Sequence, residues 1–133
     1  MTAEKLHNLL PDDYHDGALC DALYKEGTLY LYCFRNPFDP DGTDNKETRY
    51  IIIRFDNVND LQIYDWWKKA YLPYHGDSLT LNDIDAVVWG TDYLCFDEGF
   101  VEFGQCLRFR CEDLEVIAHS SEELDFSKYV KID

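Results

Sequence analysis

The chain has 133 residues and a mass of 15.7 kDa, a size typical of one folded unit, so we expect a single compact domain covering residues 1–133. Its 27 acidic and 12 basic residues give a formal net charge of -15, which disfavours nucleic-acid binding through phosphates. Hydrophobic residues make up 46% and aromatic residues 16% of the chain, which argues against an unfolded polypeptide.

Neither targeting nor membrane signals stand out in the sequence. No stretch approaches the roughly 20 apolar residues of a membrane-spanning helix, and residues 1–7 lack the basic start and apolar core of a secretory signal. We therefore expect a cytoplasmic protein with no membrane partner. The cysteines occur without a CxxC pair and mostly among apolar residues, so we expect reduced core thiols, with no metal site and no cofactor. They are Cys20, Cys33, Cys95, Cys106 and Cys111.

Two segments in the first half have the alternation typical of β-strands. In residues 28–34, leucine and cysteine at odd positions alternate with aromatic residues at even positions, so both faces of this strand should be covered. Residues 49–55 have a β-branched centre, and Ile51, Ile53 and Phe55 align on one face. We expect this second strand to be central in its sheet.

The last third of the chain contains short apolar or alternating runs separated by turn formers, which predicts a meander of hairpins. In the fourth run, Leu107, Phe109 and Cys111 share one face while Arg108 and Arg110 share the other, and residues 114–118 continue this alternation. The runs cover residues 86–89, 93–96, 100–103, 106–111 and 114–119.

Helical patterns are few. Residues 65–72 predict two helical turns capped by Asp65 and ending before Pro73, and residues 120–123 predict a capping box that opens a short C-terminal turn. Residues 36–46 and 73–78 read as loops. The predicted fold class is mainly β, an antiparallel β-sandwich or a strongly curled sheet with one or two short helices, with an α+β fold as the alternative.

The loop from Asp39 to Glu47 is rich in oxygen ligands, among them Asp41 and Asp44. A calcium loop needs glycine at its sixth position for a sharp turn, and Asp44 stands there instead. We interpret this segment as a solvated turn whose acids Asp39, Asp41 and Asp44 are available to a partner, with adventitious cation binding as the alternative.

A Cys–His nucleophile is the nearest approach to a catalytic pattern, since His15 and Asp16 precede Cys20 by a few positions. Adjacency in sequence is not the required geometry, and a strand through this segment would place Cys20 beside Ala18 and Ala22 as a small side chain filling the core. The GxSxG, HExxH and GxGxxG motifs are absent from the sequence, so we predict no catalytic residue and no enzymatic activity.

The densest aromatic cluster has five large rings within eleven positions, and Asp56, Asp60 and Asp77 flank it. Rings beside acids suit a basic partner, because aromatic side chains supply contact area and carboxylates attract cations. The alternative interpretation is a helix in which one tryptophan packs into the sheet, although two adjacent tryptophans cannot both point inward from one short helix. The predicted partner-binding residues of this cluster are Tyr64, Asp65, Trp66, Trp67, Tyr71 and Tyr74.

The order of segments resembles that of small acidic bacterial proteins of unknown function, some of which act as immunity proteins beside toxins. Residues 10–14, Leu-Pro-Asp-Asp-Tyr, are similar to the Leu-Pro-x-x-Tyr signature of the bacterial immunity superfamily related to yeast cell-wall regulators. In that family a helix and an Asn-Gly turn follow, whereas residues 15–17 are His-Asp-Gly and strand-like sequence comes next. No functional residue carries over from either resemblance.

These patterns lead to one principal hypothesis and two alternatives. The principal one is a non-enzymatic cytosolic binding protein, monomer or homodimer, that engages a basic protein partner, and its most concrete version is an immunity protein that neutralises a toxin. The first alternative is a small-ligand binder or enzyme with a pocket between the sheet and residues 66–74. The second is a structural or assembly subunit that self-associates through an unpaired edge strand such as residues 49–55.

Overall fold

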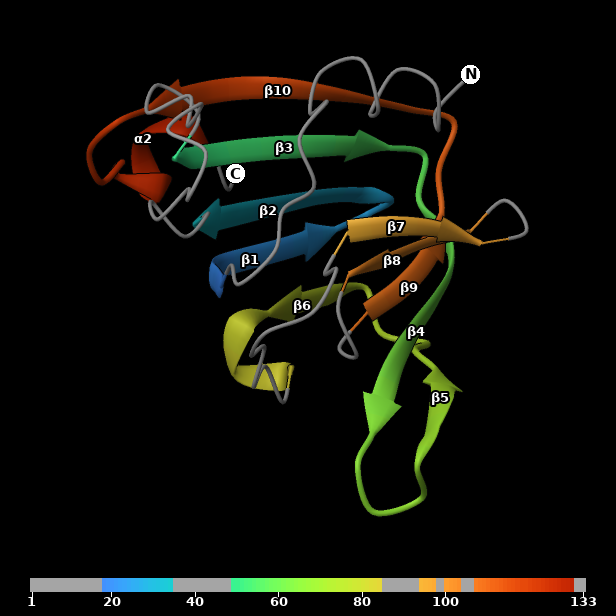
Figure 1. Cartoon of the computed structure of the whole chain (residues 1–133). Helices are drawn as coiled ribbons and strands as arrows, with labels where there is room; N and C mark the ends of the chain where they lie inside the picture. Colours follow the sequence, from blue (N-terminus) through green and yellow to red (C-terminus); the bar gives the residue numbers. More distant parts are fainter. Residues whose placement is uncertain (1–17, 35–48, 85–93, 98–99, 104–106, 131–133) are drawn as a thin grey trace.

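Antiparallel strands make up most of the described part of the computed structural model, in two sheets of five strands each (Figure 1). The structure describes residues 18–34, 49–84, 94–97, 100–103 and 107–130. Its elements are β1 (Ala18–Lys25), β2 (Thr28–Phe34), β3 (Tyr50–Asp56), β4 (Asn59–Asp65), β5 (Ala70–Pro73), β6 (Ser78–Thr80), the 3-10 turn η2 (Leu81–Asp83), β7 (Leu94–Asp97), β8 (Phe100–Phe103), β9 (Leu107–Arg110), β10 (Asp113–Ser120) and α2 (Phe126–Tyr129). The mainly β fold class with a short helix is therefore confirmed.

The first sheet has the strand order β10-β3-β2-β1-β6. The alternation predicted for β2 is confirmed, because Leu29, Leu31 and Cys33 are buried on its inner side. β3 pairs with β2 on one side and with β10 on the other. Residues 49–55 thus form an interior strand, as expected, and not the free edge that the assembly alternative required.

The second sheet has the order β5-β4-β9-β8-β7. β7, β8 and β9 are consecutive antiparallel neighbours, as the meander prediction requires, while the first predicted run, residues 86–89, lies outside the described residues. β9 carries the predicted alternation, with Leu107 and Phe109 fully buried and Arg108 and Arg110 half-buried on the opposite face.

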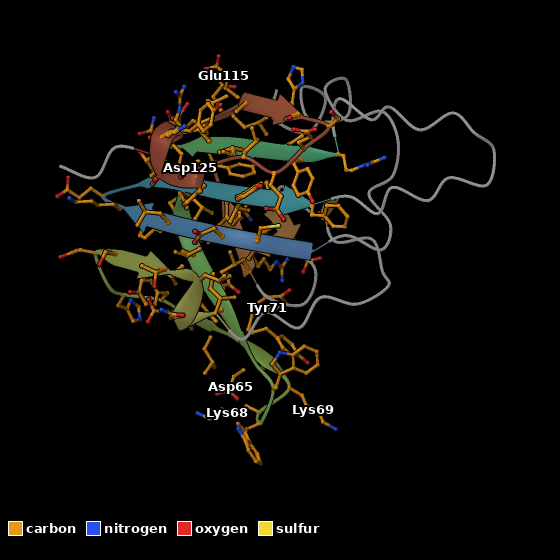
Figure 2. All side chains as sticks on the ribbon, turned by 90° about the vertical axis from the view of Figure 1, so that its left-hand side faces the viewer. Asp65, Lys68, Lys69, Tyr71, Glu115 and Asp125 are labelled. Atoms are coloured by element: carbon orange, nitrogen blue, oxygen red, sulfur yellow. The ribbon has the colours of Figure 1, made fainter. Side chains whose placement is uncertain are left out.

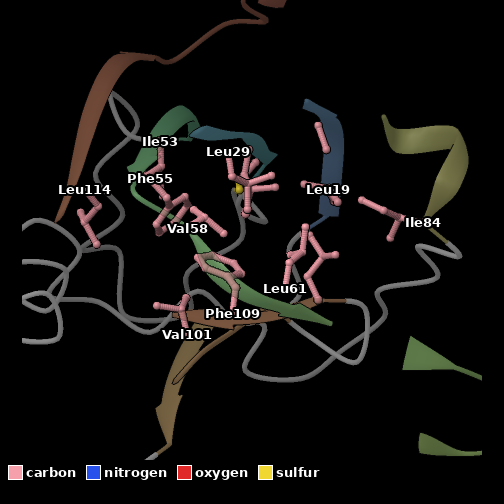
Figure 3. Packing of buried hydrophobic residues seen from close by; sticks show 14 of the residues in the cluster. Leu19, Leu29, Ile53, Phe55, Val58, Leu61, Ile84, Val101, Phe109 and Leu114 are labelled. Atoms are coloured by element: carbon pink, nitrogen blue, oxygen red, sulfur yellow. The ribbon is translucent and has the colours of Figure 1, made fainter. Parts of the chain in front are cut away.

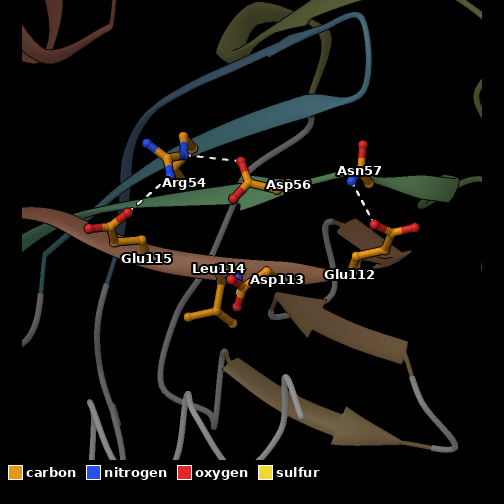
Figure 4. A network of polar contacts seen from close by, with 7 residues as sticks. All are labelled: Arg54, Asp56, Asn57, Glu112, Asp113, Leu114 and Glu115. Atoms are coloured by element: carbon orange, nitrogen blue, oxygen red, sulfur yellow. Dashed lines mark hydrogen bonds and ion pairs between the residues drawn. The ribbon is translucent and has the colours of Figure 1, made fainter.

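The meander prediction fails after β9, because β10 does not pair with β9 but with β3 in the other sheet. The chain changes sheets four times, between β3 and β4, β5 and β6, β6 and β7, and β9 and β10. The first and the last of these crossings, at Asn57–Val58 and at Cys111–Glu112, lie side by side at what we call the corner (Figure 4). The Glu112 backbone N–H donates to the Asp56 carbonyl at 3.0 Å, and the Asn57 side chain donates to the Glu112 carboxylate at 2.6 Å. Glu112 and Asp113 lie between two of the predicted strand runs and resemble a hairpin turn in the sequence, but in the structure they are part of a bend in a continuing ribbon.

The core lies between the two sheets (Figure 3). Phe55 of β3 meets Phe109 of β9 edge to face, with ring centroids 4.9 Å apart and an interplanar angle of 77°. Both rings are fully buried, and Leu61 of β4 belongs to the same cluster. Apolar residues of both sheets thus close one shared core, which corresponds to the sandwich form of the predicted architecture.

Residues 65–72 do not form the predicted helix. They are the end of β4, a turn at residues 66–69 and the start of β5. The Asp65 carboxylate does accept hydrogen bonds from the backbone that follows it, but Lys69 has a φ of 53°, in the left-handed region that a right-handed helix excludes. The same acid that would cap a helix here caps a hairpin turn.

The C-terminal segment covers the outer face of the first sheet. Tyr32 lies at 7% exposure there, stacks on Phe126 with an interplanar angle of 10°, and its hydroxyl accepts a 2.7 Å hydrogen bond from the Leu124 N–H. The predicted capping box at residues 120–123 is wrong, because α2 begins later and Asp125 caps it. The Ser120 hydroxyl instead accepts from the Glu122 N–H in a local turn.

Two β-bulges displace the predicted strand faces. In β1 the register shifts between Leu19 and Asp21, so that Leu19 and Ala22 both face the core while Cys20 is exposed. Cys20 is therefore not the core filler that strict alternation predicts. A second bulge in β10, between Val116 and Ala118, interrupts the face predicted for residues 114–118.

Candidate partner-binding site

The β4–β5 hairpin extends away from the rest of the described strands (Figures 1 and 2). Its base is anchored by Leu61, which is buried in the shared core, and by a 2.8 Å hydrogen bond from the Tyr74 N–H to the Leu61 carbonyl. β4 pairs with both β5 and β9 at Gln62 and Ile63, and beyond them Tyr64 and Asp65 pair with β5 alone. The far end of the hairpin therefore receives its order from its own strands and turn.

The turn at the far end, residues 66–69, is called the hairpin tip here, and Asp65 holds it in shape. The Asp65 Oδ1 accepts hydrogen bonds from the backbone N–H groups of Trp67 at 2.8 Å and Lys68 at 3.0 Å. These bonds satisfy donors that no strand partner reaches. The predicted binding residue Asp65 thus acts first as a positioning group for the two residues after Trp66.

The two faces of the hairpin differ in character. Tyr64 lies directly opposite Tyr71, with ring centroids 5.1 Å apart, and Tyr64 also contacts Trp66 edge to face at 4.8 Å. Ile63 lies opposite Leu72, which places this apolar pair on the other face because side chains alternate along a strand. The structure therefore brings three of the predicted aromatic residues into one cluster.

Both tryptophans of the hairpin tip are exposed, as the argument about adjacent tryptophans anticipated for at least one of them. Trp67 is 97% exposed and Trp66 39%, so the alternative of a tryptophan packed into the sheet is wrong. A large aromatic side chain buries ~150–250 Å² when it is covered, which at ~25 cal/mol per Å² is worth about 4–6 kcal/mol before ordering costs. Because Trp67 stays exposed, this free energy of burial does not contribute to folding.

A hollow of about 340 Å³ lies beside the hairpin, between its apolar pair and the 3-10 turn η2. Two carboxylates, those of Asp65 and Asp83, border it, and Asp83 accepts a 2.9 Å hydrogen bond from the Thr80 N–H that holds it in place. The hollow is lined by Ile63, Tyr64, Asp65, Trp66, Trp67, Leu72, Pro73, Tyr74 and Asp83. Apolar walls with fixed carboxylates are suited to a cationic group on an apolar stem.

Tyr74 has a structural task in addition to lining the hollow. Its ring packs against the core cluster, and its hydroxyl donates to the Ser78 carbonyl across a tight loop. A Cβ at Gly76 would collide with the Tyr74 ring, so this loop requires glycine for space. Tyr74 is thus a lining residue of the hollow that is held in place by the fold, unlike the exposed rings at the hairpin tip.

Two consecutive lysines lie at the hairpin tip. Within the described part of the chain, Lys68 and Lys69 make no ion pair, and both are exposed. In contrast, Arg54 bonds to the carboxylates of Asp56 at 3.0 Å and Glu115 at 2.9 Å. The hairpin tip thus offers positive charge next to exposed rings, on a chain whose net charge is -15.

The acids predicted to flank the aromatic cluster are partly occupied elsewhere. Asp56 pairs with Arg54 at the corner, and Asp60 lies 3.5 Å from the Arg110 guanidinium. Asp77 is exposed in the loop before β6. Among these three, only Asp77 therefore has no cation beside it that the structure describes.

The second group of predicted partner-binding acids, Asp39, Asp41 and Asp44, lies outside the described residues. No group of three or more His, Cys, Asp or Glu side chains in the described ranges is arranged to hold a metal ion. Within the same ranges, no helix combines the length and the apolar character that crossing a membrane requires.

The thiol considered as a nucleophile has its ionisation shifted away from reactivity. Partial burial of the sulfur, and then the carboxylates of Glu123 and Asp21, raise the pKa of Cys20 to about 11. The thiolate is the reactive form, so this shift makes Cys20 a poor nucleophile at neutral pH. Its proposed partners His15 and Asp16 lie outside the described residues.

Three parts of this site escaped sequence reasoning. The sequence predicts a helix that includes Lys68 and Lys69, and Asp83 is eighteen positions from Asp65, so no local pattern connects these two acids. A turn predicted for the Asp-Trp-Trp-Lys-Lys segment would also have predicted that the two lysines are exposed. The position of Asp83 next to the same hollow as Asp65 follows only from the fold. Comparisons with protein-family models, curated proteins and solved structures find no match for this chain.

Proposed function

We propose that this chain is a binding protein that engages a basic protein partner through the β4–β5 hairpin and the hollow beside it. Neutralisation of a toxin by covering its active site is the most concrete version. The observation that carries the proposal is the 97% exposure of Trp67 at the hairpin tip. Asp65 fixes the backbone of this tip through two hydrogen bonds. Tryptophan is among the residue types that dominate binding energy at protein interfaces.

The acidic residues at the hollow favour a basic partner. Asp65 and Asp83 line the hollow together with the apolar residues Ile63 and Leu72, an arrangement that suits an arginine or lysine side chain by charge and by contact with its apolar stem. The net charge of -15 would attract such a partner from a distance and speed association.

The proposal is tested by co-expressing the chain with the basic proteins encoded beside its gene and scoring growth and co-purification. For any partner found, Trp66→Ala should weaken binding at least tenfold by loss of a ring at the site. Tyr129→Ala is the matched control, because Tyr129 on α2 is 40% exposed, against 39% for Trp66, and lies on a different part of the molecule.

Salt gives a second measurement on the same complex. Raising ionic strength should slow association much more than it speeds dissociation, because long-range attraction is screened first. If no neighbouring protein is toxic, or toxicity persists in the presence of this chain, the immunity version fails. If Trp66→Ala binds the partner as tightly as Tyr129→Ala does, the hairpin is not the binding site.

A further inference from the structure

We propose that two copies of this chain associate reciprocally through their hairpins, with Trp67 of each copy seated in the hollow of the other. Lys68 and Lys69 beside each Trp67 would then face the Asp65 and Asp83 carboxylates of the opposite hollow. The proposal goes beyond the binding of a basic partner and does not depend on it.

The first support is that one chain carries both halves of the contact. The hairpin tip offers an indole at 97% exposure followed by two lysines without an ion pair among the described residues. The hollow offers apolar walls and two carboxylates within a volume of about 340 Å³, which has room for an indole ring. Because tip and hollow adjoin on one hairpin, a two-fold axis can satisfy both contacts at once.

The second support is the separation of the hairpin tip from the acidic remainder. Beyond Ile63, the last β4 residue that pairs with β9, Tyr64 and Asp65 extend the hairpin to the tip, a length of roughly 7 Å at about 3.3 Å per residue. This is close to the Debye length of about 8 Å at physiological ionic strength. The positive tip can therefore approach carboxylates of a second copy while the repulsion between the two acidic bodies is partly screened.

The geometry of β5 directs self-association to side chains and away from the backbone. β5 is the edge strand of its sheet, but it has only four residues and ends at Pro73, which has no N–H to donate. Continuing the sheet into a second copy through β5 would form too few hydrogen bonds to hold a dimer. Docking of Trp67 into the hollow would bury the exposed indole and the walls of the hollow, which pairing of two β5 strands would leave exposed.

Sedimentation velocity of the purified chain at physiological salt tests the proposal, over concentrations from low micromolar to submillimolar. The contact is near the lower limit of specific interface areas, so we expect a reversible dimer in the upper part of this range. Trp67→Ala should weaken association at least tenfold, and Tyr129→Ala should leave it unchanged. Since Trp67 is almost fully exposed, its removal should not impair folding.

Charge reversal provides the sharper test. A Lys68→Glu/Lys69→Glu variant should fail to dimerise, because its tip places carboxylates opposite Asp65 and Asp83. An Asp83→Lys variant should also fail, because it places a lysine opposite Lys68 and Lys69 of the other copy. Mixed together they should form a heterodimer, because the introduced lysine then faces the introduced glutamates at one contact, and Lys68 and Lys69 face Asp65 and Asp83 at the other. Asp83→Lys also removes the acceptor of the Thr80 N–H, so its melting temperature is measured first, and Asp83→Asn serves as a milder variant with an oxygen acceptor retained.

Three results would overturn the proposal: a monomer at every concentration, a Trp67→Ala variant that dimerises like the parent, or a dimer whose mixed charge variants show no rescue. None of these measurements includes another protein. Their failure would therefore leave the proposed binding of a basic partner untouched, and loss of that partner would leave the dimer untouched.

Discussion

Large apolar side chains serve opposite purposes in the shared core and at the hairpin tip. Phe55 and Phe109 meet across the two sheets at 0% exposure, whereas Trp66 and Trp67 face solvent only a few residues beyond the buried Leu61. Burial of the first pair stabilises the fold, while the second pair has contact area that folding does not use. Residue type alone therefore does not distinguish apolar side chains that stabilise the fold from apolar side chains that are exposed for contact.

Charged groups differ between the same two regions. Near the corner, Arg54 bonds to two carboxylates, and Arg110 lies over the Phe100 ring at 3.9 Å with Asp60 nearby. At the hairpin tip, Lys68 and Lys69 have no such partner among the described residues. Near the corner, charged side chains interact with one another within the chain. At the hairpin tip, the charges of the two lysines are available for contact with another molecule.

Truncating one ring in each region should give the largest contrast. Phe109→Ala removes a fully buried ring in contact with Phe55 and should lower the free energy of unfolding by about 3–5 kcal/mol. Trp67→Ala should change it by less than about 0.5 kcal/mol, the usual limit for surface positions. Urea denaturation measures both. Similar losses for the two variants would mean that the hairpin tip belongs to the folded core, contrary to the comparison.

A smaller effect should follow from releasing the turn. Asp65→Ala removes two hydrogen bonds from its carboxylate to the Trp67 and Lys68 N–H groups and should destabilise the hairpin by about 1 kcal/mol. Hydrogen exchange should become faster at the hairpin amides and remain unchanged in β2 and β3. Asp65→Asn, which keeps an oxygen acceptor, is the control and should stay near the parent. Faster exchange throughout the chain would show that the hairpin does not open independently.

The smallest effect concerns alkaline pH. The pKa of Cys20 is about 11 in the fold against an ordinary value of 9.0, so above pH 9 the thiol ionises more readily in the unfolded chain. Stability that this group contributes below pH 9 is therefore lost as the pH rises toward 11. Cys20→Ser should show a shallower fall of melting temperature over this interval, by a few degrees at most. Parallel profiles for the two proteins would contradict this cause.

Much of the strand pattern could be predicted from the sequence. The alternation in β2 and β9 and the β-branched centre of β3 each identified a buried face correctly, because a strand repeats its side-chain direction every two residues. The aromatic cluster around Trp66 and Trp67 was also recognised as a surface candidate. These successes concern neighbours in sequence, for which local geometry is sufficient.

The errors concern features that depend on distant partners or on one backbone angle. The Asp-Trp-Trp-Lys-Lys segment is compatible with both the start of a helix and a turn. The left-handed backbone of Lys69 and the pairing of β5 with β4 make it a turn. The step from β9 to β10 was read as a hairpin because the sequence does not reveal that β10 pairs with β3. The exposure of Cys20 followed from a bulge that strict alternation cannot anticipate.

The sequence by itself therefore determined a mainly β chain, its buried strand faces and a cluster of rings beside acids, because these follow from residue type and short-range periodicity. Only the tertiary structure decided that Trp67 stands exposed on a projecting hairpin beside Lys68 and Lys69, and that Asp65 and Asp83 border one hollow. The physical reason is that exposure and proximity depend on which strands pair and where the chain changes sheets. Those choices are made by contacts between residues far apart in the chain.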